Sequence, residues 1–153
     1  MEGARRAGSY RDLEAWKKSM RLASTVYRVT ASWPAEERYG LTGQIRRAAT
    51  SVPSNVAEGQ GRMGKAEMRH HLSIAHGSLC EVETLLYLSS DIGFLDPTER
   101  DGLLTDTNEV GRILRGFIMS LDRGGSKLTS RGQDSSRLLD SSTSRLATEG
   151  STL

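Results

Sequence analysis

The sequence is poor in several features that mark whole classes of protein. Its 153 residues include one cysteine, Cys80, so no disulfide can form within the chain and nothing argues for an oxidising compartment. No apolar stretch approaches the roughly 20 residues that a membrane-spanning helix needs. Polar residues follow Arg5 and Arg6, where a signal peptide would have its apolar segment. These absences predict a cytoplasmic protein with no membrane partner.

Aromatic residues and net charge are also low. Aromatic side chains make up 5% of the residues, so the core must be built mostly from aliphatic residues and alanine, a composition that favours helices. The formal charge of +2 allows contact with a phosphate backbone but does not require it. A chain of this length is sufficient for one domain with a hydrophobic core.

Four segments have apolar residues in alternating steps of three and four, the spacing of an amphipathic helix. The first begins at Ser9, which with Asp12 forms an acidic variant of the capping box, and ends before Trp33-Pro34. The rows predicted to face the core are Leu13, Trp16, Met20, Ala23, Tyr27 and Thr30 in the first segment, Leu41, Ile45, Ala49, Val52 and Val56 in the second, Met68, Leu72, Ala75, Leu79, Val82, Leu86 and Ser89 in the third, and Leu103, Thr107, Val110, Leu114, Phe117 and Leu121 in the fourth.

Turn and cap residues separate these segments. Gly40 precedes the second helix, which is expected to continue past Pro53. The third helix spans about 65–92 and ends at Gly93, and Asp96-Pro97-Thr98-Glu99 is a typical N-terminus for the fourth. Helices on short connections lie antiparallel to their neighbours. The sequence therefore predicts an all-α protein, an antiparallel up-down four-helix bundle.

This bundle is expected to occupy residues 9–122, between two segments without a core. Residues 1–8 are expected to be a flexible N-terminus. From Arg123 the chain is rich in Ser, Thr and Gly with isolated leucines, too little apolar surface to offset the entropy of ordering it. Residues 123–153 are therefore predicted to be a disordered tail.

Residues that could support catalysis or metal binding occur without the companions that such sites need. Glu67 and His70 have the Glu-x-x-His spacing of di-metal bundles, but the motif occurs once, which favours a solvated helix flank. His76 and Cys80 are one turn apart, but a structural zinc site needs four ligands, and a nucleophilic cysteine needs an activating base and an orienting group. We expect no catalytic residue, no metal and no other cofactor, hence a protein that is not an enzyme.

A polar stripe runs beside the apolar row of the second helix. It consists of Arg47, Ser51, Asn55, Glu58 and Arg62, and the third helix offers Ser78, Glu81 and Glu83 as complements. Polar groups next to a packed seam usually satisfy one another, which fixes the register of the helices or a contact between subunits. Direct contact with a ligand is the alternative interpretation of the same stripe.

The glycine-rich turn before the third helix lacks the spacing and preceding strand of a nucleotide-binding loop, so an ordinary interhelical turn explains it. Arg62 and Lys65 nevertheless stand at a helix N-terminus, where a phosphate group is favoured. Together with Arg46 and Arg47 they are the candidate contacts to nucleic acid.

Long stretches of the chain resemble the four-helix-bundle proteins named after 23S ribosomal RNA intervening sequences. The resemblance covers about residues 9–121 and rests on Tyr10–Leu13 with Trp16, Tyr39–Ala49, Ser51–Gly59 with Gly61 and Arg62, Ile74–Leu79, and Glu81–Thr84. It implies a bundle that assembles as a ring, typically a homopentamer, with no established catalytic activity. A related branch, the accessory variability determinant of diversity-generating retroelements, binds nucleic acid and a reverse transcriptase.

Two functions are therefore expected from the sequence. The first is a homo-oligomer associated with RNA or DNA, in which several copies multiply a modest basic patch. The second is a protein-binding scaffold or accessory subunit, with a partner such as a reverse transcriptase and no contact to nucleic acid.

Overall fold

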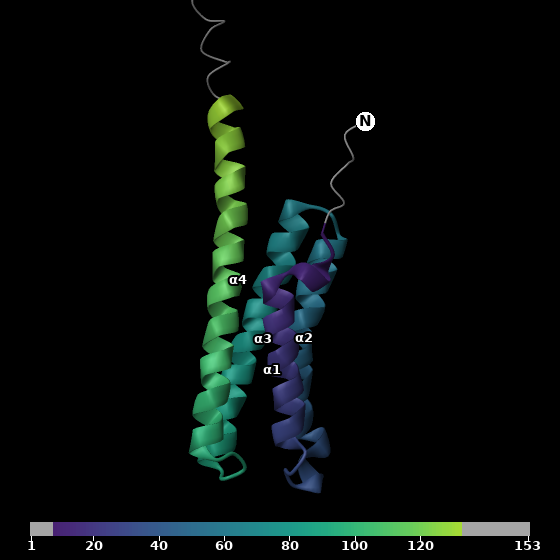
Figure 1. The fold of residues 1–153 in the computed structure, drawn as a ribbon, viewed down its shortest axis with the longest axis vertical. Coiled ribbons are helices and arrows are strands. Elements are labelled where there is room, and N and C mark those ends of the chain that lie inside the picture. Colours follow the sequence, from purple (N-terminus) through teal and green to yellow (C-terminus); the bar gives the residue numbers. More distant parts are fainter. Residues whose placement is uncertain (1–7, 133–153) are drawn as a thin grey trace, which may run out of the picture. The chain divides into compact units, whose positions relative to one another are not determined.

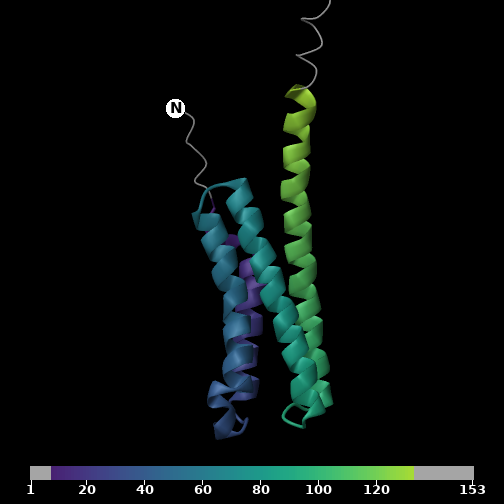
Figure 2. The ribbon, with the colours of Figure 1, turned by 180° about the vertical axis from the view of Figure 1, so that it is seen from behind.

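Helices account for all the regular structure in residues 8–132, the part of the chain that the computed structural model describes. They are η1 (Tyr10–Asp12), α1 (Glu14–Thr30), η2 (Ala35–Tyr39), α2 (Leu41–Gly61), α3 (Lys65–Asp91) and α4 (Pro97–Gly132). The chain divides into one unit through Met119 and a second from Ser120. In the first unit, successive long helices run in opposite directions beside one another (Figures 1 and 2). The predicted all-α four-helix bundle is confirmed.

Aliphatic side chains fill the core, as the composition predicts. Every residue of the rows predicted for the second and third helices is buried, as are the first four of the row predicted for the fourth. In that row Phe117 and Leu121 are only half-buried. The largest side chains with almost no exposure are Leu22, Ile45, Leu72, Leu86, Leu95 and Leu114.

The row predicted for the first helix is correct at Ala23 and Thr30, but the other buried positions lie on a neighbouring row. α1 buries Ala15, Ser19, Leu22, Ala23, Val26 and Thr30. Met20 and Tyr27, predicted to be core, are 40% and 46% exposed. The buried row is difficult to recognise in the sequence because one of its members, Ser19, is polar. The Ser19 hydroxyl donates to the carbonyl oxygen of Trp16 at 3.0 Å and therefore needs no water. Two adjacent rows of α1 are thus apolar, and only one can face the core.

The helix ends follow the predicted caps, with one correction. The Ser9–Asp12 capping box is present, but it caps the short helix η1; Leu13 is then extended, and α1 begins at Glu14 rather than Ser9. α2 passes through Pro53 without interruption. Gly93 has φ +83°, the left-handed conformation expected after α3. Asp96 accepts a hydrogen bond from the backbone nitrogen of Thr98 at 2.8 Å, as an N-cap residue does.

The fourth helix is longer than predicted. α4 continues to Gly132, past the boundary expected between residues 122 and 123. Once a helix has formed, each added residue gains a hydrogen bond without repeating the cost of nucleation, so a Ser- and Gly-rich composition does not stop it at once. Most of the predicted tail, 133–153, and most of the predicted N-terminal segment, 1–7, lie outside the described residues. No described helix is long and apolar enough to cross a membrane.

Candidate functional site

An open groove lies between α1 and α2 in the first unit. It has a volume of about 620 Å³ and is lined by Tyr10, Trp16, Met20, Ala23, Ser24, Tyr27, Thr50, Pro53, Ser54 and Ala57. None of these side chains is charged. The long apolar side chains come from η1 and α1, whereas α2 supplies small ones, which leaves the space between the helices open.

The α1 wall of this groove is the row that the sequence assigned to the core. Met20 and Tyr27 face it with about half of their surface exposed. At one end the rings of Tyr10 and Trp16 meet edge to face, with centroids 5.5 Å apart. Neighbouring exposed apolar side chains on one wall make the groove a candidate surface for a partner.

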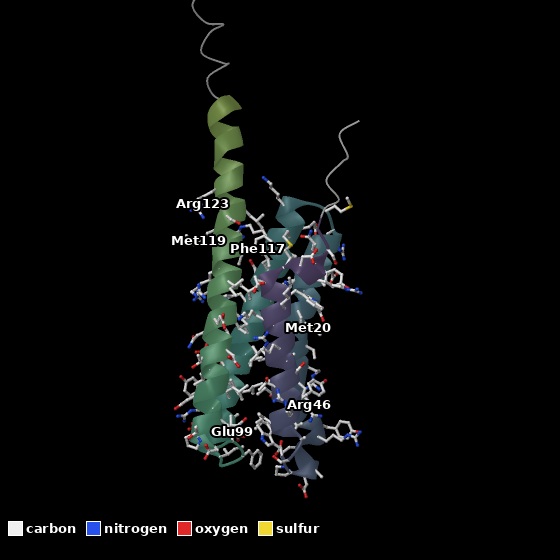
Figure 3. All side chains as sticks on the ribbon, in the orientation of Figure 1. Met20, Arg46, Glu99, Phe117, Met119 and Arg123 are labelled. Carbon is white, nitrogen blue, oxygen red and sulfur yellow. The ribbon has the colours of Figure 1, made fainter. Side chains whose placement is uncertain are left out.

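Arg46 lies against Tyr27, one of the residues that line the groove. Its guanidinium lies 4.5 Å from the centroid of the Tyr27 ring, its Nε donates to Thr30 Oγ1 at 2.8 Å, and its Nη2 donates to the carbonyl oxygen of Tyr27 at 3.3 Å. A cation is favourable at the C-terminus of α1, where backbone carbonyls have no helical partner. Arg46 therefore fixes the position of Tyr27 and of the end of α1. Met20 and Arg46 are labelled on this side of the bundle in Figure 3.

The four cations predicted to contact nucleic acid do not gather at one place. Arg47 is exposed near the start of α2, whereas Arg62 ends it and pairs with Glu58 at 2.9 Å. Arg47 and Arg62 are fifteen residue steps apart, about 22 Å along the helix axis. Lys65 is exposed at the start of α3, near Arg62 in sequence.

The polar stripe of α2 forms a hydrogen-bonded track against α3. Asn55 Nδ2 donates to Ser51 Oγ at 3.1 Å, and Ser78 Oγ donates to the same oxygen at 2.9 Å. Asn55 Oδ1 lies 3.0 Å from His71 Nδ1, and His71 Nε2 lies 3.9 Å from Glu58 Oε1. Since the amide oxygen can only accept, His71 Nδ1 carries the proton in this contact. The track fixes α2 against α3 at the level of His71 and Ser78.

Sequence reasoning missed the residue at the centre of this track. His71 is 8% exposed, whereas the histidines it singled out, His70 and His76, are less buried. The available signal was position: His71 is three residues after Met68 and directly before Leu72, on the flank of the buried row. Glu81, predicted as part of the same network, is exposed on α3 and makes none of the described contacts of the track.

The residues considered for catalysis or metal binding lie elsewhere. Cys80 Sγ is 3.8 Å from His76 Nδ1, and Arg115 Nη1 is 3.2 Å from His76 Nε2. A guanidinium only donates, so Nε2 accepts and the proton of the neutral ring lies on Nδ1, which cannot then take the thiol proton. Glu67 and His70 are both exposed on α3. No cluster of three or more potential metal-ligating side chains occurs in the described part of the chain.

The groove and the polar track lie almost entirely within the residues that match one protein family. The family described as "23S rRNA-intervening sequence protein" matches residues 11–116, which include all of the polar track and all of the groove except Tyr10. The chain belongs to this family. The match ends near the C-terminal limit of the first unit.

Comparison with solved structures supports the fold of the family. The chain resembles a crystal structure from Bacteroides thetaiotaomicron, described as a protein with unknown function from the S23 ribosomal protein family. The two chains are 21% identical, with a TM-score of 0.64, and the match covers 69% of this chain and 95% of the other. At this identity the likeness shows a shared fold. None of the curated proteins matches the sequence.

Proposed function

We propose that this member of the 23S rRNA-intervening sequence protein family is a non-enzymatic subunit that assembles with copies of itself through the α1–α2 groove, in the cytoplasm. The observation that carries the proposal is the exposure of Met20 and Tyr27, 40% and 46%, on the wall of an uncharged groove. Covering such a surface removes apolar area from water, the main favourable term in most protein association. The ring assembly implied by the family resemblance agrees with it.

A matched pair of methionines tests the proposal. Met20 lies in the groove, whereas Met119 is 59% exposed on α4 and does not line it. Met20→Glu is expected to reduce the mass measured by light scattering toward one subunit, because a carboxylate would be desolvated in the contact. Met119→Glu should leave the mass unchanged. Both variants should retain the helical circular dichroism of the parent, and equal masses for the two variants would remove the groove from the assembly.

Nucleic-acid association is a second candidate, and one observation favours it. α1 carries Lys17, Lys18, Arg21 and Arg28, and the sequence has no acidic residue between Ala15 and Ala35. Lys17 pairs with Glu14 and Lys18 with Glu109, whereas Arg21 and Arg28 are exposed. These two arginines can contact phosphates, and assembly would repeat them in every copy.

This candidate is tested by the salt dependence of binding. Labelled single-stranded RNA should bind the protein in low salt and lose affinity steeply as salt rises, and Arg21→Glu with Arg28→Glu should weaken it. No binding in low salt would leave the protein as a scaffold for protein partners, the other function expected from the sequence.

A further inference from the structure

We propose that the occupant of the α1–α2 groove is the exposed face of α3, from Glu81 to Ile92, of a second copy. This inference rests on the proposed function and adds which surfaces meet. It is carried by three observations: a second apolar stripe on α3, the opposite charge of the two surfaces, and their equal length.

The stripe on α3 lies outside its buried row. Ile74, Leu88 and Ile92 are 40%, 46% and 49% exposed. Together with Ser78, Glu81 and the buried Leu85 they recur in steps of four and three, so they share one side of the helix. Beside them, a Cβ added at Gly77 would meet no atom within 4 Å, which leaves the helix surface open to close approach.

The two surfaces carry opposite charges that the net charge of +2 conceals. The helices that form the groove carry Lys17, Lys18, Arg21, Arg28, Arg46 and Arg47, and no acidic residue occurs in 15–35 or 38–57. On α3 from Glu81 to Ile92 the charged residues are Glu81, Glu83 and Asp91, and none is basic. Complementary potentials of this kind steer association and fix its register.

The dimensions of the two surfaces agree. Along α1 the groove extends from Trp16 to Tyr27, and the acidic half of the α3 stripe extends from Glu81 to Ile92. Each covers eleven residue steps, about 16 Å of helix. The small side chains of α2, Thr50, Ser54 and Ala57, leave room for a helix, and an inserted helix would place Leu88 and Ile92 against Met20 and Tyr27.

The apolar lining also decides between a protein and a nucleic acid as the occupant. Nucleic acid would supply negative charge to Arg28 and Arg47 and could stack a base on an exposed ring, but Met20, Pro53 and Ala57 offer no flat face for stacking and suit aliphatic side chains better. The α3 face supplies both negative charge and aliphatic side chains. Because each copy carries a groove and a different complementary face, the contact is head-to-tail and repeats from copy to copy until it closes a ring.

A charge exchange tests the contact. Arg28→Glu with Arg47→Glu, and separately Glu81→Lys with Asp91→Lys, should each raise the concentration at which half of the protein is assembled by about tenfold. The chain with all four substitutions should recover most of the loss, because the charges are again opposite. The exposed Glu67→Lys with Glu99→Lys is the control with the same change of net charge, and it should assemble like the parent.

Cross-linking provides a readout that does not depend on charge. In a Cys80→Ser background, Tyr27→Cys with Leu88→Cys should give a ladder of covalent oligomers with a short bismaleimide, whereas either substitution alone should give monomers.

The outcomes separate this inference from the proposed function. A parent protein that is monomeric at every concentration overturns both. Assembly that is lost in Met20→Glu but unchanged by the α3 substitutions, or cross-linking by Tyr27→Cys alone, overturns the pairing and leaves self-assembly standing. RNA that protects Tyr27→Cys from labelling in unassembled protein would identify nucleic acid as the occupant and overturn the inference.

Discussion

Close approach of α2 and α3 depends on single residues around the polar track. A Cβ added at Gly59 would lie 2.9 Å from His71 Cβ and 2.9 Å from Met68 Sδ. His71 is held there by Asn55, so it cannot move away without breaking that hydrogen bond. The polar track can therefore form only if residue 59 has no side chain.

Gly59→Ala is expected to destabilise the protein by about 1–3 kcal/mol, because overpacking displaces buried neighbours. Gly116→Ala in α4 is the control, since a Cβ there meets nothing within 4 Å and alanine favours a helix interior by roughly 0.5–1 kcal/mol. Urea unfolding followed by circular dichroism measures both. Equal stability of the two variants would show that the helices are farther apart than described.

Met63, in the turn between α2 and α3, has an unusual backbone conformation. Its φ is +59°, and it is the only described non-glycine residue with a positive φ. Its side chain is 93% exposed and so contributes almost no packing. Met63→Gly should therefore stabilise the protein by about 1 kcal/mol, since the left-handed conformation costs a side chain that amount. A lower urea midpoint for this variant would contradict the turn geometry.

At the scale of helices, the periodicity of apolar residues predicted the buried side of a helix where one apolar row predominates. The rows predicted for α2, α3 and the first half of α4 are buried, and the second stripe of α3 is interrupted by the polar residues Ser78 and Glu81. α1 has two apolar rows, and choosing between Leu22 and Met20 requires knowing where α2 and α4 lie, which no local pattern contains. For the same reason the groove could not be predicted, although Trp16, Met20 and Tyr27 were recognised as apolar. Arg46 was recognised as a cation, but its contacts with Tyr27 and Thr30 join helices that only the fold brings together.

The two rows of α1 can be distinguished by their stability effects. Leu22→Ala is expected to cost about 2–5 kcal/mol, because Leu22 is 1% exposed and its removal leaves a cavity. Met20→Ala should cost less than about 1 kcal/mol, since Met20 lies in the open groove. Both are measured by urea unfolding at low protein concentration, where assembly contributes least. The reverse order of the two effects would restore the row predicted from sequence.

At the scale of the whole chain, an almost neutral protein carries strongly segregated charge. Lys18 and Glu109, 3.1 Å apart, already pair the basic α1 with the acidic start of α4 within the subunit. The remaining cations of α1 and α2 and the remaining acids of α3 lie on different surfaces. The proposed head-to-tail contact would cover the exposed apolar side chains and pair opposite charges at the same time.

The mass of the parent protein in solution tests self-assembly most directly. Sedimentation velocity over a range of protein concentrations should show a species of several 16.8 kDa subunits that dissociates on dilution. A single species of 16.8 kDa at every concentration would contradict the account.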